Sequence, residues 1–199
     1  MHSDDTRDVI LLAAERLFAE RGVLAVSNRQ VSEGAGQRNS SAVGYHFGTK
    51  DDLVLAIVEK HARLIEEHRI RMLANIEGST DLRDWVSCLV LPYIEHLASI
   101  GESSSYARFS AQVMTDPTLR GLIYETALES PALRRILEGV LSCVGDLPES
   151  VRRTRGDMVR QLMVHMSAER ERNNPDGWTD FGTDLVDAMV GLWSAPVTR

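Results

Sequence analysis

The sequence predicts an all-α protein with about nine or ten helices. Apolar residues recur every three or four positions over long stretches, as they do along one face of a helix. Glycine, proline and capping residues stand where these stretches begin and end. No stretch between turn signals alternates apolar and polar residues in the manner of a strand. These patterns predict three N-terminal helices that a long fourth helix joins to a larger helical body.

The first helix is expected to begin at about Thr6, which can cap it, and to stop before Gly22. The second helix is short. Ser27 and Gln30 form a capping box at its start, because Gln30 lies three residues after the cap. Gly36 supplies its stop.

Asn39 can cap a short third helix that runs to Phe47. Thr49 and Asp52 form a second capping box, which opens a fourth helix that extends to about Ile76. At ~1.5 Å per residue this helix is roughly 40 Å long. It is too long to belong to the N-terminal unit alone, so we expect it to join that unit to the rest of the chain.

Further helices are predicted along the remainder of the chain. Pro92 lies inside the first of them and should kink it. Ser130 followed by Pro131 is a cap with proline at the first helical position. The expected ranges are about 82–97, 104–115, 118–128, 131–141, 148–172 and 178–194.

Composition is that of an ordinary soluble protein, with 43% hydrophobic residues and a net charge of -7 in 199 residues. No apolar run approaches the roughly 18 to 20 residues of a membrane span. The polar start, MHSDDTRD, differs from a secretory signal peptide. We therefore expect a cytoplasmic protein with no membrane partner. Cys88 and Cys143 could form a disulfide, but two reduced buried thiols suit that compartment better.

The second and third helices, joined by a glycine-containing turn, form a helix-turn-helix, whose second helix can lie in the major groove of DNA. The net charge at first argues against a nucleic-acid partner. Residues 1–50, however, hold six basic and six acidic side chains, so the excess of acid lies in residues 51–199. Because phosphate affinity depends on local charge, this distribution permits DNA binding.

Three segments, LLAAERLFAERG (11–22), RQVSEGAG (29–36) and YHFGTKDDL (45–53), resemble the DNA-binding domain of the TetR family of bacterial transcriptional regulators. The resemblance implies a helix-turn-helix DNA-binding domain in residues 1–50 and a helical ligand-binding and dimerisation domain in residues 51–199. It also implies a homodimer that releases DNA when a small molecule binds. The chain departs from the commonest family pattern at Gln37, which lengthens the turn, and at Gly44, where a larger side chain is usual.

Four apolar side chains should fix the N-terminal unit: Phe18, Val31, Val43 and Phe47. A unit of ~50 residues is marginally stable alone, so it also needs the fourth helix packed against it.

Polar side chains around the turn and the third helix are the candidate DNA contacts. In the family, positions such as Tyr45 and His46 donate to backbone phosphates, although His46 could instead close the turn. Lys50 is either a cation at an anion-binding helix start or a solvated lysine. Asn39 could read a base or spend its side chain on the cap. The full set is Arg29, Gln37, Arg38, Asn39, Ser40, Ser41, Gly44, Tyr45, His46, Thr49 and Lys50.

Large side chains of the body have two interpretations. Those of the central helices form either core or the wall of an effector pocket. The candidates for the pocket are Trp85, Leu89, Tyr93, His96, Phe109 and Gln112. Those of the last two long helices form either a four-helix dimer interface or contacts within one chain. The candidates for the interface are Met158, Leu162, His165, Met166, Phe181, Leu185, Met189 and Leu192.

The sequence favours a ligand-released repressor that binds a near-palindromic operator in double-stranded DNA as a homodimer. One alternative is an activator or a co-repressed regulator of the same fold. An alternative from a different class is a helical small-molecule-binding protein without operator binding. No close metal-ligand spacing, phosphate loop or nucleophile motif is present, so we expect neither an enzyme nor a cofactor. Arg152, Arg153 and Arg155 are expected to form a solvated or acid-paired face.

Overall fold

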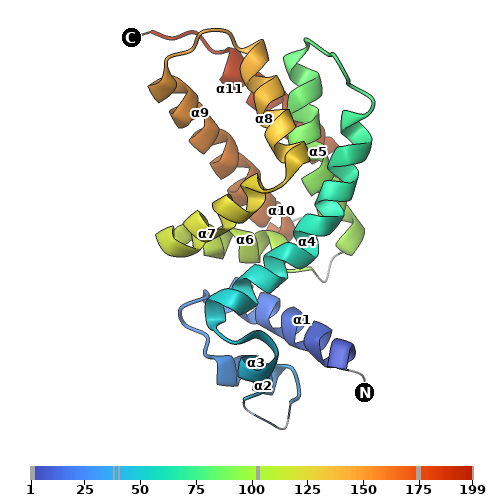
Figure 1. The fold of residues 1–199 in the computed structure, drawn as a ribbon, viewed down its shortest axis with the longest axis vertical. Coiled ribbons are helices and arrows are strands. Elements are labelled where there is room, and N and C mark those ends of the chain that lie inside the picture. Colours follow the sequence, from blue (N-terminus) through green and yellow to red (C-terminus); the bar gives the residue numbers. More distant parts are fainter. Residues whose placement is uncertain (1–2, 38, 40, 102–103, 174–175, 199) are drawn as a thin grey trace.

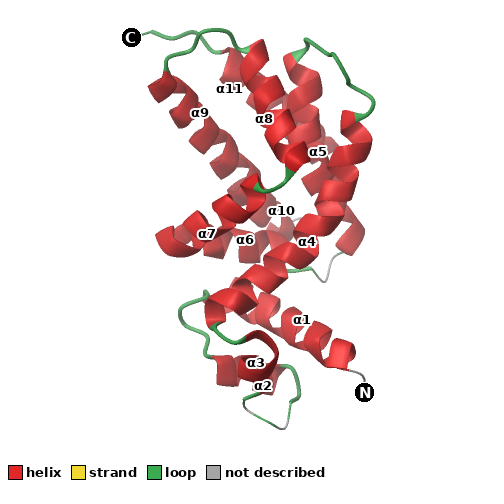
Figure 2. Cartoon of the chain, in the orientation of Figure 1, coloured by secondary structure: helices red, strands yellow, loops and turns green. Residues whose placement is uncertain are grey.

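The computed structural model describes residues 3–37, 39, 41–101, 104–173 and 176–198. Within these ranges the chain is helical and holds no strand, as predicted (Figure 2). Figure 1 shows the three N-terminal helices, in shades of blue, below a larger group of helices, with one long helix crossing between the two. We call the first three helices the head and the helices after the long one the body. None of the helices in the described ranges combines the length and apolar character that a bilayer crossing needs.

The first helix of the head, α1 (Ser3–Arg21), starts ahead of the expected cap at Thr6. It ends where predicted, at Gly22. This glycine has a φ of 83°, and its N–H bonds to the Phe18 carbonyl at 2.9 Å. A left-handed glycine of this kind ends a helix because a residue with a Cβ would be strained there.

The helix-turn-helix pair consists of α2 (Asn28–Gly34) and α3 (Ala42–Phe47). The predicted capping box at the start of α2 is present. The Ser27 hydroxyl accepts from the Gln30 N–H, and the Gln30 side chain accepts from the Ser27 N–H at 2.8 Å. α3 stops at Gly48, which also has a positive φ of 84°. The start of α2 and the stop of α3 thus act locally, as the sequence predicts.

The long connecting helix is α4 (Lys50–Leu73). Its predicted capping box is also present, since Thr49 and Asp52 exchange side-chain and backbone hydrogen bonds. The α-helix ends before the predicted Ile76 because the backbone hydrogen bonds beyond its C-cap span three residues instead of four. The Ile76 N–H bonds to the carbonyl of Leu73, three residues back, at 3.1 Å.

The body follows the predicted order of helices. Pro92 lies buried inside the first of them, and Ser130 caps the helix that opens with Pro131, as expected. The helices are α5 (Leu82–Ile100), α6 (Tyr106–Thr115), α7 (Pro117–Leu128), α8 (Pro131–Cys143), α9 (Glu149–Gln161), α10 (Ser167–Asn173) and α11 (Trp178–Ser194).

A π-helical turn, Leu162–Met166, lies between α9 and α10. The sequence predicts a single helix over 148–172, and the structure has helical backbone over 149–173 with this wider turn inside it. A π-turn takes up an extra residue and rotates the face that follows it. Hydrophobic spacing did not predict it, because only one turn departs from the regular period.

Head and body share one continuous hydrophobic core. The four apolar residues predicted to fix the head, Phe18, Val31, Val43 and Phe47, are all buried in it. Phe18 is fully buried and its ring lies 6.3 Å from the ring of Phe109 on α6. The head is therefore not held by α4 alone, because α1 also packs directly on the body.

Gly139 of α8 lies against the indole of Trp85 on α5. A Cβ at this position would come within 2.1 Å of the Trp85 ring. The ring cannot easily retreat, because it is buried and its N–H donates to the Ser79 carbonyl at 3.1 Å. We expect Gly139→Ala to cost about 1–3 kcal/mol through overpacking. This exceeds the gain of about 1 kcal/mol that alanine normally brings to a helix.

The test of this close approach is chemical denaturation of two glycine variants. Gly121 of α7 is exposed, and a Cβ there would meet nothing within 4 Å. Gly121→Ala should therefore leave the denaturation midpoint unchanged or raise it, while Gly139→Ala lowers it. Equal midpoints for the two variants would contradict the packing described.

Both cysteines are free, as expected. Cys88 is buried, and burial, with a smaller effect of Asp84, raises the pKa of its thiol to about 11. Cys143 is half-buried.

The arginine cluster at the start of α9 is only in part the expected solvated face. Arg153 pairs with Glu149 at 3.1 Å. Arg155 is instead buried, and its guanidinium donates to the carbonyls of Trp193 and Ala195 at the end of α11. It satisfies carbonyl groups that a helix end leaves without partners.

Candidate nucleic-acid interface

The third helix presents one face to the core and the other to solvent. Val43 and Phe47 are buried and fix the helix on the rest of the head. Gly44 and Tyr45 point the other way, and Tyr45 is 85% exposed. The ring of Tyr45 meets the ring of His46 edge to face at 5.0 Å. This places a phenol hydroxyl and an imidazole together at the C-terminal end of α3.

The turn before α3 differs from the prediction in its cap. The helix begins at Ala42, so Ser41 is the capping residue. The Asn39 side-chain oxygen accepts from the N–H and the hydroxyl of Ser41, at 3.0 and 2.6 Å. Asn39 therefore shapes the turn rather than capping the helix directly, and its oxygen is occupied. Arg38 and Ser40 lie outside the described residues.

Two further candidates for base contacts are held by local bonds. The side chain of Arg29 is 75% exposed and forms an ion pair with Glu33, one turn later on α2, at 2.8 Å. The hydrogen bond and charge of Glu33 raise the pKa of Arg29. The amide of Gln37 donates to the Ala35 carbonyl at 3.2 Å. Arg29 is the more exposed of these two side chains. Because an exposed ion pair is weak, Arg29 can leave Glu33 for another partner more readily than Gln37 can leave the Ala35 carbonyl.

The start of α4 carries local hydrogen bonds, and its predicted role as an anion site stays a prediction. The Thr49 hydroxyl donates to the Asp52 carboxylate at 2.6 Å, so its proton is already used. The Thr49 hydroxyl, and then the Thr49 N–H, lower the pKa of Asp52 by hydrogen bonding to its charged form. Lys50 donates to the Val23 carbonyl at 3.2 Å. A capping box thus places a carboxylate where a phosphate would otherwise bind.

One contributor to this surface was missed by the sequence analysis. Arg7 of α1 stacks its guanidinium on the ring of Phe47, 4.2 Å from its centre, and donates to the His46 carbonyl at 2.8 Å. It ties α1 to the end of α3. No signal in the sequence marks this contact, because Arg7 and His46 are 39 residues apart.

The six residues predicted to line an effector pocket lie on α5 and α6. All of them are buried except the half-buried Gln112. Two cavities border α1, of about 570 and about 600 Å³, and neither is lined by any of the six. A role of these residues in ligand binding stays a prediction.

The residues predicted to form a dimer interface divide into two groups. Leu185 and Met189 of α11 are buried within their own chain, in the core shared with α5, as the alternative interpretation allows. Met158, His165 and Met166 are exposed on the helix that α9 and α10 form. The remaining candidates, Leu162, Phe181 and Leu192, are half-buried.

Comparison with models of protein families matches residues 10–57 to the family described as bacterial regulatory proteins, tetR family. The matched segment runs from α1 into the first part of α4. It therefore contains the helix-turn-helix and the surface described above. No curated protein matches the chain.

Solved structures of similar fold extend over nearly the whole chain. NalD, described as the secondary repressor of the MexAB-OprM multidrug efflux pump in Pseudomonas aeruginosa, is 23% identical, with 95% of this chain and 96% of that chain covered and a TM-score of 0.61. A TetR family transcriptional regulator, PfmR from Thermus thermophilus, is 18% identical, with coverages of 90% and 96% and a TM-score of 0.58. A tetR family regulator described as putative, from Shewanella sp. PV-4, is 18% identical, with coverages of 94% and 95% and a TM-score of 0.62. At these identities the likeness establishes the fold.

Proposed function

We propose that this chain, a member of the tetR family of bacterial regulatory proteins, is a homodimeric repressor that leaves a near-palindromic operator when a small molecule binds. It is a DNA-binding transcriptional regulator by its matched N-terminal domain and its fold. In this proposal residues 1–50 form the DNA-binding domain. Residues 51–199 bind the effector and the second protomer, and the protein acts in the cytoplasm.

The outward face of α3 is the observation that supports operator binding most. Val43 is fully buried and Tyr45 is 85% exposed, so the core fixes the helix while its other face stays free. A Cβ at Gly44 would meet nothing within 4 Å, which leaves room for a DNA backbone to approach. A rigid helix with one free face is what insertion into a major groove requires.

Exposed methionines support the homodimer. Met158 and Met166 are 49% and 46% exposed and lie on the helix that α9 and α10 form. Half-buried Leu162 and Phe181 add apolar surface from that helix and from α11. A second copy of this surface would cover these side chains, and a two-fold dimer would place two recognition helices on one face of a duplex.

Helix α4 is the element through which an effector would act. At its head end it starts from the Thr49 capping box. At its body end the Glu66 carboxylate accepts from the hydroxyl of Ser130, the cap of α8, at 2.6 Å. A ligand that favours another position of α4 in the body would therefore also move the head. Operator affinity falls if the ligand binds that second state more tightly.

Footprinting on a fragment selected from the source genome tests the proposal. We expect two protected half-sites whose centres lie ~34–36 Å apart, or a multiple of that spacing, and two chains per site. Adding a small-molecule extract of the source cells should lower the fraction of bound fragment. A rise in the bound fraction would mean co-repression, and a single protected half-site with one chain bound would contradict the dimer.

A further inference from the structure

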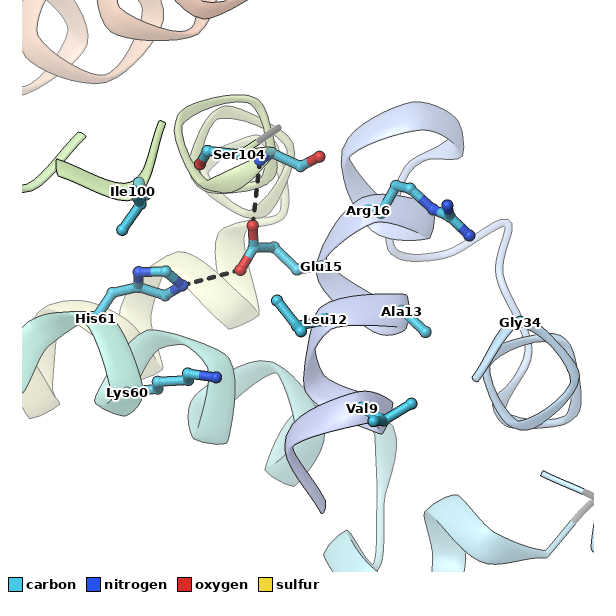
Figure 3. Close-up of a pocket in the computed structure, with 11 residues that line it drawn as sticks. Val9, Leu12, Ala13, Glu15, Arg16, Gly34, Lys60, His61, Ile100 and Ser104 are labelled. Carbon is cyan, nitrogen blue, oxygen red and sulfur yellow. Dashed lines mark hydrogen bonds and ion pairs between the residues drawn. The ribbon is translucent and has the colours of Figure 1, made fainter. Parts of the chain in front are cut away.

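Three polar side chains form a hydrogen-bonded chain across the junction between head and body. The Glu15 carboxylate on α1 lies 2.9 Å from Nε2 of His61 on α4. Nδ1 of His61 lies 2.7 Å from Nε2 of His96 on α5. The second oxygen of Glu15 accepts from the Ser105 N–H, just before α6, at 3.3 Å. Figure 3 shows Glu15 reaching from α1 toward His61, with dashed lines to His61 and to the start of α6.

All three side chains are buried, with exposed fractions of 7% for Glu15, 7% for His61 and 1% for His96. The ring of Tyr106, on α6, stacks on the ring of His61 with 3.7 Å between the ring centres and covers it on that side. Burying a carboxylate is costly unless it is paired, and apolar side chains would pack such a junction at lower cost. The three polar side chains therefore have a role other than packing.

With the Glu15 carboxylate ionised and His96 neutral, two arrangements of protons satisfy every hydrogen bond among the three side chains. In the first, both rings are neutral: Nε2–H of His61 donates to Glu15, and Nε2–H of His96 donates to Nδ1 of His61. In the second, the chain holds one more proton. His61 then has both N–H groups and donates Nδ1–H to His96, whose own proton has moved to Nδ1. The added proton comes from solvent, and no heavy atom has to move.

The second arrangement strengthens the contact between α1 and α4. A hydrogen bond from a neutral ring to a carboxylate becomes an ion pair between an imidazolium and a carboxylate, in a buried site where such pairs are strong. Histidine is the side chain that gains a proton near neutral pH. Uptake of a proton by these side chains would therefore change the strength of the junction between head and body without a change in packing.

Neighbouring groups keep the added charge beside Glu15. Burial lowers the pKa of His96 to about 4, with further lowering by His61 and His68 and an opposing effect of Glu15. His96 is thus a neutral ring that can either donate or accept. The charged and titratable groups around the three side chains are Glu15 and Arg16 from α1, Lys60, His61, His68 and Arg69 from α4, Glu95 and His96 from α5, and Tyr106 and Arg108 from α6.

Solvent reaches the chain from one side. Glu15 and His61 line the cavity of about 570 Å³ between α1, α4 and the start of α6. Figure 3 shows both side chains at this cavity, with Lys60 beside them. A proton can therefore enter or leave the chain without unfolding of the core.

We propose that Glu15, His61 and His96 form a proton-responsive latch that holds the head on the body. The latch tightens when these three side chains together take up one proton. This inference goes beyond operator binding and can be tested without DNA or an effector. Its failure would leave the proposed function intact, and a failure to bind DNA would leave the latch intact.

Hydrogen exchange of the intact chain tests the latch. After correction for the intrinsic exchange rates, we expect protection of the α1 amides to rise about tenfold between pH 8 and pH 5.5. In Glu15→Gln the same amides should show almost no rise, because an amide offers no charge to pair with the imidazolium. An α1 response in Glu15→Gln equal to that of the natural sequence would overturn the proposal.

Two matched variants serve as controls. Asp8→Asn breaks the exposed ion pair of Asp8 with Lys60, at 3.0 Å, which joins the same two helices. His68→Gln removes another histidine of α4, which pairs with Glu95 near the surface at 2.9 Å. Both variants should keep the full α1 response. Loss of the response in His68→Gln would place the proton elsewhere and would also overturn the latch.

Protection of α5 and α11 in the same experiment shows whether Glu15→Gln folds. If it does not, His96→Leu is the second variant, because it leaves Glu15 and His61 in place but removes the partner of His61 Nδ1. Its α1 response should also be lost. Imidazole ¹⁵N spectra of the natural sequence give a separate reading: the added proton should appear on His61 while His96 stays neutral. Protonation of His96 before His61 would contradict the proposed arrangement.

Discussion

Replacing Phe18 by alanine is expected to destabilise the whole protein, not the head alone. Phe18 is fully buried on α1 and stacks against Phe109 of the body at 6.3 Å. Removing such a ring costs about 3–5 kcal/mol, which lowers the melting temperature by roughly 10 °C in a chain of this length. Because head and body share one core, thermal unfolding should remain a single transition.

Leu12→Ala is the matched control on the same helix. Leu12 is 60% exposed, so its truncation should change the free energy of unfolding by less than about 0.5 kcal/mol. Two separate transitions in Phe18→Ala, with the body melting at its original temperature, would show that the head folds as an independent unit. That result would contradict the shared core.

Replacing Tyr45 by alanine is expected to lower operator affinity about 100-fold while leaving the melting temperature unchanged. The side chain is 85% exposed, so its loss removes little packing. A hydrogen bond to a charged phosphate contributes about 1.5 kcal/mol, and a dimer loses two of them. The combined loss of about 3 kcal/mol corresponds to about two decades in the dissociation constant. Band shifts on the selected fragment measure this directly.

Tyr45→Phe and Tyr124→Ala separate the contributions. Tyr45→Phe keeps the ring and removes only the hydroxyl, so its affinity should lie close to that of Tyr45→Ala. Tyr124 is 54% exposed and belongs to α7, a helix of the body that Figure 1 shows apart from α3. Tyr124→Ala should bind as the natural sequence does. Unchanged affinity in Tyr45→Ala would remove α3 from the DNA interface.

Local signals account for the parts of the fold that could be predicted. Ser27 and Thr49 begin helices because each finds its partner three residues later, and Gly48 ends a helix by its own φ. Such interactions need no knowledge of the remainder of the chain. The head, the long connecting helix and the order of the body helices were therefore predictable. The π-turn at 162–166 was not, because it breaks the helical period only once.

Long-range contacts explain what the sequence could not predict. Glu15 and His61 are 46 residues apart, and no local spacing marks them as partners. Leu185 and Met189 form a stripe that suits a partner chain or the core of their own chain equally well, and the structure buries them in that core. At Thr49 the predicted cap is confirmed, while its predicted phosphate contact stays a prediction, because the hydroxyl also donates to Asp52. A side chain that shapes the local backbone has fewer donors left for a ligand.

Capture of fragments of the source genome by the purified chain, at modest ionic strength, tests the central claim most directly. The account predicts that the chain retains a small set of fragments that share a near-palindromic sequence, and that Tyr45→Ala retains them far less well. If the natural sequence retains no fragment above the level of Tyr45→Ala, with or without a small-molecule extract of the source cells, the head is not an operator-binding domain.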